Sequence, residues 1–429
     1  MKKRLQASPI DPILVRDGRP FNAVPGIRAR TLNDVMPSTF AGSIRTLLIK
    51  KEADAGLHDA IKKLKVRGPL YRLHGSLYFT MPQDIEFYEM DERKESKASV
   101  GVHRIKPEPL NPNDGVYSES GFWGIGKEGR LEDELWLPIG AGTTKRLKST
   151  PAYVSEGWML KWLTEKLHEE KGAEQLEDWL EKRDKPVLKA SVGMDSDQPS
   201  FFLPAFSREE RTHTAIDSQR YAAKDQQLFS TESLVLPDGL TLEAEVEGPN
   251  SLSQNLQDIS ELHTLGGKRR LIHFIEAEET IGSNHEPAAS FWDCPSLISE
   301  ALQDKRYIRM VLATPAFFRK GWIPGWLDEQ LVSKESLSKN VKLRLRWACI
   351  PRWQPVSGWA YSKEKGPQAR AVRRMVPAGS VYFFEVIDGN PADLAQEKWL
   401  ESVSDQNRRA EAHDAEDGFG LALWGSWTI

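Results

Sequence analysis

The pattern of apolar and polar positions predicts a chain in which strands are more numerous than helices. Residues 341–350 alternate Val, Leu and Trp with Lys and Arg, which is the period of a strand with one buried face. Residues 69–90 read as a hairpin of strands, and the turn Pro237-Asp238-Gly239 is typical of a hairpin. Further strands are expected at 5–15, 227–236, 240–247, 270–276, 306–313, 380–387 and 421–429.

Apolar residues at helical spacing predict helices at 40–55, 155–183, about 251–263 and roughly 393–415. Ser38 or Thr39 is the expected N-cap of the first of these helices. The segment 155–183 places tryptophans and leucines on one face, and this stripe either packs a helical insertion or docks a partner. Between the elements, the polar Gly- and Pro-rich stretch from 91 to 150 predicts long loops.

Both halves of the chain show the same expected order of helix, glycine turn and strand. In the first half, the helix near 251–263 leads into Gly266-Gly267 and the strand 270–276. In the second half, Gly418-Phe419-Gly420 precedes the last strand. This order predicts an α+β fold made of two related units, each with an antiparallel sheet and helices on one face.

Composition and charge narrow the class of protein. A length of 429 residues favours two domains, and no apolar run is long enough to span a membrane. The two cysteines lie in no C-x-x-C pair, so one disulfide is possible but a reduced cytoplasmic protein is favoured. The scattered histidines argue against a zinc site, and no cofactor is expected. The net charge is −4, yet cations gather in the first fifty residues and acids at 165–184 and 401–417. Such separated charges allow RNA on one face and a protein partner on another.

The turn Leu265-Gly-Gly-Lys-Arg-Arg270 is the first candidate for binding chemistry. Two glycines let backbone N–H groups approach a phosphate closely, and Lys268, Arg269 and Arg270 add positive charge. A tight helix C-cap with solvated charges explains the same residues equally well. The spacing is not that of a nucleoside-triphosphate P-loop.

Three further groups of residues are candidates. Small residues at 37–45, including Gly42, begin a helix whose free N–H groups suit an anion, although a simple capped helix has the same pattern. His213 and Asp217 lie among arginines and aromatics, which suits RNA stacking and also resembles a general acid–base pair. A third group, Arg370, Arg373 and Arg374, forms either a binding edge or solvated surface charge.

Together these motifs resemble the third subunit of the Cmr module, a RAMP-superfamily member of the type III-B CRISPR effector. They occur in family order over nearly the whole chain. The matching segments are 16–21, 37–45, His213 to Asp217 with Leu228-Phe229, 265–270, Thr314-Pro315-Ala316, 321–324, 376–380 and 418–420.

The resemblance implies two ferredoxin-like (RRM-like) RAMP domains, at 1–285 and 286–429, with an insertion at about 91–200 in the first. It also implies a non-catalytic scaffold that captures the 5′ handle of CRISPR RNA (crRNA). The implied protein partners are the large cyclase/polymerase-like subunit and the backbone RAMP subunit. The residues expected to bind RNA are Gly42, Arg45, His213, Asp217, Arg220, Gly266, Gly267, Lys268, Arg269, Arg270, Arg373 and Arg374.

Two other functions are compatible with the sequence. One is a metal-independent endoribonuclease that matures precursor crRNA, with His213 or His263 as general acid or base. The other is a protein-interaction subunit that does not touch RNA, which the acidic net charge and the many tryptophans suggest.

Overall fold

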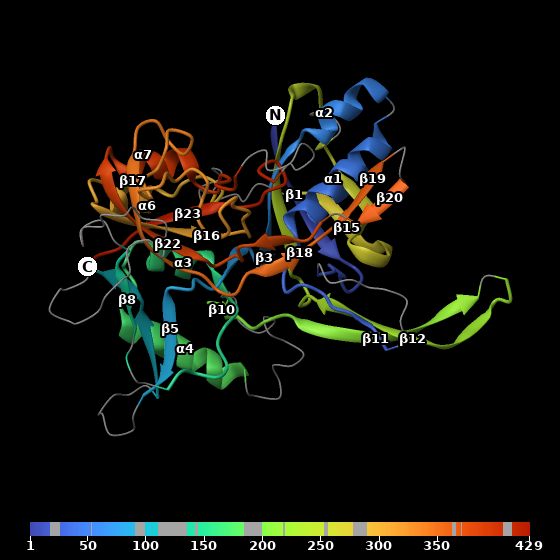
Figure 1. Cartoon of the computed structure of the whole chain (residues 1–429), viewed down its shortest axis with the longest axis horizontal. Helices are drawn as coiled ribbons and strands as arrows, with labels where there is room; N and C mark the ends of the chain where they lie inside the picture. Colours follow the sequence, from blue (N-terminus) through green and yellow to red (C-terminus); the bar gives the residue numbers. More distant parts are fainter. Residues whose placement is uncertain are drawn as a thin grey trace.

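We describe a computed structural model of the chain. The structure describes residues 1–17, 26–52, 54–90, 99–109, 135–140, 142, 145–183, 200–217, 219–252, 256–277, 290–362, 366–369, 371–405 and 414–429. Over these residues the fold is α+β, and its sheets are almost entirely antiparallel (Figure 1). None of the described helices is long and apolar enough to cross a membrane.

The largest sheet of the described residues has eight strands in the order β10-β9-β4-β3-β13-β1-β15-β14. Helix α1 (Pro37–Lys51) packs on this sheet, and Phe40 on its buried face contacts Phe274 of β15. In chain order the strands are β1 (Lys2–Pro9), β3 (Lys65–Leu73), β4 (Ser76–Thr80), β9 (Tyr153–Ser155), β10 (Phe202–Leu203), β13 (Thr241–Glu247), β14 (Ser260–Leu265) and β15 (Arg270–Glu276).

A second sheet, with four strands, carries the C-terminal third of the chain, and its strands follow the order β17-β22-β16-β23. Short helices α6 (Ser296–Leu302) and α7 (Pro391–Lys398) contact β23. The strands are β16 (Tyr307–Leu312), β17 (Lys342–Cys349), β22 (Val381–Asp388) and β23 (Ala422–Ser426).

The remaining described elements are smaller. A three-stranded sheet contains β11 (Ser207–Asp217), β12 (Ala222–Val235) and β2 (Arg28–Ala29). Two-stranded pairs are β5 (Ile85–Glu89) with β6 (Val100–Arg104), β7 (Lys106–Glu108) with β8 (Leu137–Ile139), β18 (Gln354–Val356) with β21 (Arg373–Met375), and β19 (Trp359–Ser362) with β20 (Gly366–Ala369). The other described α-helices are α2 (His58–Lys62), α3 (Glu156–Leu163) and α4 (Glu169–Arg183). Short 3-10 helices lie at Ala55–Leu57, Asn250–Leu252 and Gly267–Arg269.

The two large sheets share one strand order. In the first, β3-β13-β1-β15 are neighbours, and in the second β17-β22-β16-β23 are neighbours. Numbered along the chain, each set runs second, third, first, fourth, and all adjacent pairs are antiparallel. The two sheets therefore share one four-strand order, but the repetition expected from the sequence, a helix, a glycine turn and a strand in each half, is not found in the described residues of the first half.

The predicted helix at 251–263 is wrong over its second part, because residues 260–265 form strand β14. Leu252, Leu256 and Ile259 are buried at helical spacing, which explains the prediction. However, β14 pairs along its whole length with β15, and the ladder hydrogen bonds decide the conformation. The glycine turn therefore joins two strands, not a helix and a strand. The predicted helix at 393–415 is also too long, since α7 ends at Lys398.

Other boundaries change for tertiary reasons. The 237–239 turn exists, but the strands on either side belong to different sheets, so it closes no hairpin. Met36 is the N-cap residue of α1, with Pro37 in the first turn, so Ser38 and Thr39 lie inside the helix. The strand expected at 5–15 ends at Pro9, and the loop expected at 91–150 contains β6, β7 and β8.

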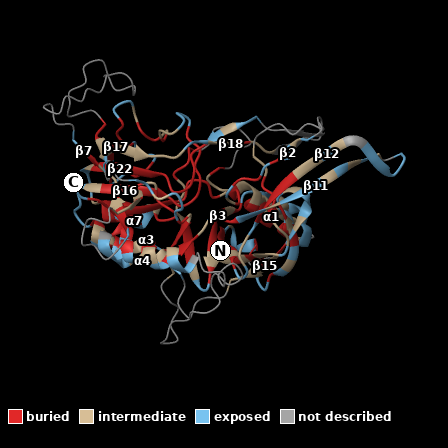
Figure 2. Cartoon of the chain, turned by 90° about the horizontal axis from the view of Figure 1, so that it is seen from below, coloured by how far each residue is buried: buried red, intermediate tan, exposed pale blue. Residues whose placement is uncertain are grey.

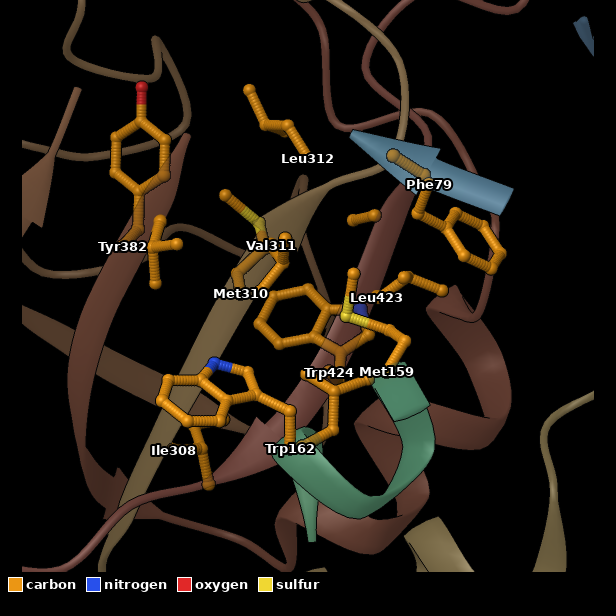
Figure 3. Packing of buried hydrophobic residues seen from close by; sticks show 14 of the residues in the cluster. Phe79, Met159, Trp162, Ile308, Met310, Val311, Leu312, Tyr382, Leu423 and Trp424 are labelled. Carbon is orange, nitrogen blue, oxygen red and sulfur yellow. The ribbon is translucent and has the colours of Figure 1, made fainter. Parts of the chain in front are cut away.

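The tryptophan stripe of 155–183 is part of the core. Trp158 and Trp162 are fully buried and stack with a centroid distance of 5.2 Å. Figure 3 shows Trp162 and Met159 of α3 beside Ile308 of β16 and Trp424 of β23. The packing interpretation is confirmed for these residues, and the docking alternative is wrong, because no face of either indole reaches solvent.

A fully buried ion pair lies beside this packing. Arg309 of β16 contacts Asp84, and both side chains have no exposed area. The Trp162 indole donates a hydrogen bond to Asp84 at 3.0 Å, and the Arg309 guanidinium donates to the Trp162 carbonyl. Three segments distant in sequence are thereby joined at one point.

The turn around Gly418 holds the two large sheets together. Gly418 has φ +91°, and a Cβ there would lie 2.4 Å from the Gly68 carbonyl oxygen. Nearby, the Val66 amide donates to the Glu416 carbonyl, and Phe419 is fully buried against Phe317. Only glycine fits this backbone at this separation.

We expect Gly418→Ala to lower the free energy of unfolding by about 2 kcal/mol or more, because the new Cβ adds a backbone clash to an unfavourable φ. Gly42→Ala is the matched control. It lies inside α1 with nothing within 4 Å of an added Cβ, so it should stabilise by roughly 0.5–1 kcal/mol. Denaturant unfolding followed by circular dichroism measures both, and equal effects would contradict this account.

Candidate nucleic-acid interface

The β11–β12 hairpin projects from the body of the molecule, and most of its outer half is exposed (Figures 1 and 2). The outer half lacks a covering layer, so cross-strand contacts must stabilise it. At its tip, the Asp217 carboxylate accepts hydrogen bonds from the amides of Gln219 and Arg220 at 2.9 and 3.2 Å. These bonds lower the pKa of Asp217 and form the turn. Arg220 itself is exposed.

The turn between β14 and β15 is fixed by a close approach to Leu14. Gly266 has φ +73°, and a Cβ there would lie 2.5 Å from the Leu14 carbonyl oxygen. The Gly267 amide donates to that same oxygen at 2.7 Å. The predicted use of this N–H for a phosphate is therefore wrong, because the amide already has a partner. The glycines position the following side chains instead.

Lys268 and Arg269 follow with left-handed φ values of 58° and 50°. Such values cost a non-glycine residue about 1 kcal/mol and are concentrated at functional sites. Both residues are exposed. The turn therefore directs the side chains of Lys268 and Arg269 to solvent, while the β14–β15 ladder and Leu14 hold its backbone in place.

Two motifs distant in sequence meet beside this turn. Lys268 Nζ lies 2.9 Å from His213 Nε2 and 5.3 Å from the centroid of the Phe229 ring. Across the hairpin, His213 stacks on Phe229 with a centroid distance of 5.2 Å and an interplanar angle of 26°. The Thr231 hydroxyl also lies 2.9 Å from His213 Nε2. We call His213, Phe229 and Lys268 the His–Lys cluster.

The electrostatics of the His–Lys cluster favour an anion. Desolvation lowers the pKa of His213, and the charges of Lys268, Arg270 and Arg211 lower it further. Desolvation and then Arg270 also lower the pKa of Lys268. An approaching phosphate would relieve this repulsion between cations and would find stacked rings beside it.

Two of the predicted arginines are used inside the protein. Arg45 is paired with Asp417 and donates to the carbonyls of Leu64 and Glu416 at 2.6 and 3.2 Å. Arg373 binds both carboxylate oxygens of Asp414 at 2.8 Å. Both arginines therefore hold the segment that precedes Gly418. The acidic character of that segment was visible in the sequence, but its partners were not.

The start of α1 does not match the anion site expected at 37–45. Pro37 lines a small cavity together with Asp34, whose carboxylate accepts hydrogen bonds from Tyr71 and Tyr153 at 3.3 and 2.8 Å. Desolvation raises the pKa of Asp34. A carboxylate at this helix end opposes a second anion. Gly42 lies on α1 with no atom within 4 Å of a Cβ built there, and the Ser43 hydroxyl donates to the Thr264 carbonyl.

The remaining predicted residues lie apart from the His–Lys cluster. His213 and Asp217 are four residues apart on one strand, about 13 Å, so they form no acid–base pair. Arg374 is exposed, and its guanidinium lies 5.0 Å from the centroid of Trp353. Arg370 lies outside the described residues. Phe229 was noted only as a neighbouring aromatic, and no sequence signal announced that it would stack on His213.

No group of three or more metal-ligating side chains occurs among the residues that the structure describes. Cys294 and Cys349 are free thiols. Burial raises the pKa of Cys349 to about 12, which makes its thiol unreactive.

The similarity of this chain to individual known proteins is low. Curated protein sequences give no match. Among solved structures, a chain of type III-B Cmr-beta bound to cognate target RNA and AMPPnP is 12% identical, over 89% of this chain and 86% of that chain, with a TM-score of 0.42. A chain of the Csm3–Csm4 subcomplex of the type III-A CRISPR-Cas interference complex is 10% identical, over 90% and 94%, with a TM-score of 0.38. Likeness at this level carries no argument about function.

The sequence match to a protein family is decisive. The family model described as CRISPR-associated protein (Cas_Cmr3) matches residues 5–427, which is nearly the whole chain. This family is the one that the ordered motifs resemble. The chain therefore belongs to the Cas_Cmr3 family of CRISPR-associated proteins and is a Cmr subunit of the RAMP type.

Proposed function

We propose that this chain is a non-catalytic RNA-binding scaffold of a type III-B CRISPR (Cmr) effector complex, and that it captures the 5′ handle of crRNA. The family match supports membership of such a complex. The observation that carries the RNA-binding role is the His–Lys cluster, where Lys268 meets His213 across 55 residues of sequence. A cation over stacked rings suits single-stranded RNA, because a phosphate and a base can be held together.

The RNA-binding surface proposed here is smaller than the sequence suggested. It comprises the His–Lys cluster, the neighbouring cations Arg269 and Arg270, and the exposed side of the β11–β12 hairpin with Arg220 at its tip. Arg45 and Arg373 are left out, since their charges are matched by Asp417 and Asp414. Lys and Arg side chains that remain unmatched contribute most to phosphate binding.

We also infer that the fold is a pair of ferredoxin-like RAMP domains. The shared strand order supports this, because second-third-first-fourth is the order of a β-α-β-β-α-β unit in an antiparallel sheet. One crossover helix is kept in each half, α1 in the first and α7 in the second. All strands of the first set precede residue 285 and all strands of the second follow it, as a boundary there requires.

Contacts with the large cyclase/polymerase-like subunit and the backbone RAMP subunit are part of this proposal, as is a cytoplasmic location. The chain would link these two partners while it holds the RNA.

Charge reversal at the turn tests the RNA-binding role. In complexes purified with the double variant Arg269→Glu and Arg270→Glu, we expect loss of the short co-purified RNA with a uniform 5′ end. The log–log salt slope of binding should fall by roughly 0.7 for each phosphate that the variant no longer neutralises. Lys62→Glu with Lys63→Glu, at the C-terminal end of α2, is the matched control and should retain the RNA. Equal retention in both variants, with RNA crosslinks only to other subunits, would instead support a purely protein-binding role.

The pKa of His213 gives a pH test. Because that pKa is lowered in the free protein and a bound phosphate would raise it, RNA binding should take up a proton. Affinity is therefore expected to rise as pH falls from about 7.5 toward 5.5, around the ordinary histidine value. The same lowered pKa makes the free fold lose stability on acidification, since the unfolded chain binds more protons. His213→Gln should flatten the affinity profile measured by fluorescence anisotropy, and His58→Gln should not.

A second candidate function follows from the same contact. A neutral imidazole 2.9 Å from an ammonium could act as a general base beside a group that stabilises negative charge, as an endoribonuclease requires. We expect the purified chain to leave precursor crRNA intact, because Nε2 of His213 is already held by Lys268 and Thr231. Site-specific cleavage that disappears in His213→Ala but persists in His263→Ala would establish the nuclease instead.

A further inference from the structure

A second aromatic and basic site lies away from the His–Lys cluster. A cavity of about 390 Å³ is lined mainly by residues from the end of β17 and from the segment between β17 and β22, together with the 321–322 loop and Leu135. Its lining residues are Leu135, Gly321, Trp322, Trp347, Ala348, Ile350, Pro351, Arg352, Trp353, Arg374, Met375 and Val376. We call it the Trp353 pocket.

The walls of the Trp353 pocket are apolar, while its charges have one sign. Among the described lining residues, the charged ones are Arg352 and Arg374, and both are exposed. Trp353 is 44% exposed, although a large indole normally gains by burial. The Arg374 guanidinium lies 5.0 Å from the centroid of the Trp353 ring. An open indole with a cation against it is therefore accessible to a ligand.

This chemistry matches one occupant best. An exposed flat ring favours a flat partner, and two arginines with no carboxylate among the described lining residues favour an anion. A nucleotide supplies both, as a base for the indole and a phosphate for the guanidinium groups. The volume is at the lower end of the range of about 300–1,000 Å³ for small-ligand sites, which suits one nucleotide and not a longer segment. An acidic peptide would match the charge but would leave the ring without a stacking partner.

The position of the pocket fits a strand of RNA that continues from the hairpin. Along the long axis of the molecule, β18 lies between the four-stranded sheet and the β11–β12 hairpin in both views (Figures 1 and 2). Gln354 of β18 directly follows Trp353, and Arg374 belongs to its partner strand β21. The antiparallel pairing of β18 with β21 brings Trp353 and Arg374 close together, and we assign Trp353 to the base and Arg374 to the phosphate.

We propose that the Trp353 pocket holds one splayed nucleobase of single-stranded RNA, stacked on Trp353, with its phosphate bound by Arg374 and Arg352. Purines are preferred, because their larger rings give more stacking area. The proposal rests on the function proposed above, in that the chain must bind RNA, but it concerns a separate site.

The probe is a synthetic 12-nucleotide single-stranded RNA that carries 2-aminopurine at one position at a time, titrated into the full chain. Stacking on an indole quenches this fluorophore. We expect strong quenching at one position, its loss in Trp353→Ala, and retention of most of it in Trp353→Phe. Affinity should fall about tenfold in Trp353→Ala, in line with the usual effect of removing a stacking ring.

The matched control is Phe201→Ala. Phe201 is also an exposed aromatic, at 39%, with a cation, Lys161, 5.9 Å from its ring centroid. It lies outside the pocket, so quenching and affinity should stay unchanged. Circular dichroism and thermal unfolding verify that each variant is folded.

The outcomes separate this proposal from the one on which it rests. If Trp353→Ala leaves quenching and affinity unchanged while Arg269→Glu with Arg270→Glu releases the RNA, the pocket proposal is wrong and the scaffold proposal stands. If neither variant affects RNA, both are wrong. Loss of a protein subunit in Trp353→Ala, with RNA still bound, would identify the pocket as a peptide site and overturn the proposal.

Discussion

The ion pair between Arg309 and Asp84 fixes strand β16 of the four-stranded sheet to helix α3 and to the segment that follows β4. Neither side chain is exposed, and the pair is completed by the indole and the carbonyl of Trp162. Removing one member of such a pair typically costs about 3–5 kcal/mol, because the other charge remains buried without a partner. Trp162 therefore stabilises this region in two ways. Its ring packs against residues of β16 and β23, and its N–H and carbonyl groups form hydrogen bonds with the buried Asp84 and Arg309.

The need to pair a buried charge also explains which cations pair with carboxylates and which remain available to a ligand. Arg45 and Arg373 lie where the two halves meet, and each is paired with an acidic residue of the segment before Gly418. Arg269 and Lys268 lie on a turn whose glycines are pressed against Leu14, and they face solvent. A cation near the core needs a carboxylate, whereas a cation on a supported turn can keep its charge for a ligand. Position in the fold, not residue type, separates the two groups.

The His–Lys cluster illustrates how a projecting element is held in place. A two-stranded hairpin is marginally stable by itself. His213 stacks on Phe229 near the middle of the hairpin, and Lys268 joins this point to the eight-stranded sheet. Lys268 and Arg269 keep unfavourable left-handed φ values because the β14–β15 ladder on either side fixes the turn. A site proposed for RNA is thereby held on rigid supports, while the exposed length of the hairpin extends the surface available to a flexible strand.

Local patterns in the sequence were sufficient for the α+β class, for strand β15 at the predicted residues and for the packing role of the tryptophans in α3. These features depend on side-chain periodicity, which a sequence contains in full. The strand at 260–265 could not be foreseen, because its apolar residues fit a helix until β15 offers hydrogen-bond partners. Nor could the meeting of His213 with Lys268, or the pairing of Arg45 with Asp417, since both join segments far apart in the chain. Such contacts follow from strand register and burial, which only the tertiary structure decides.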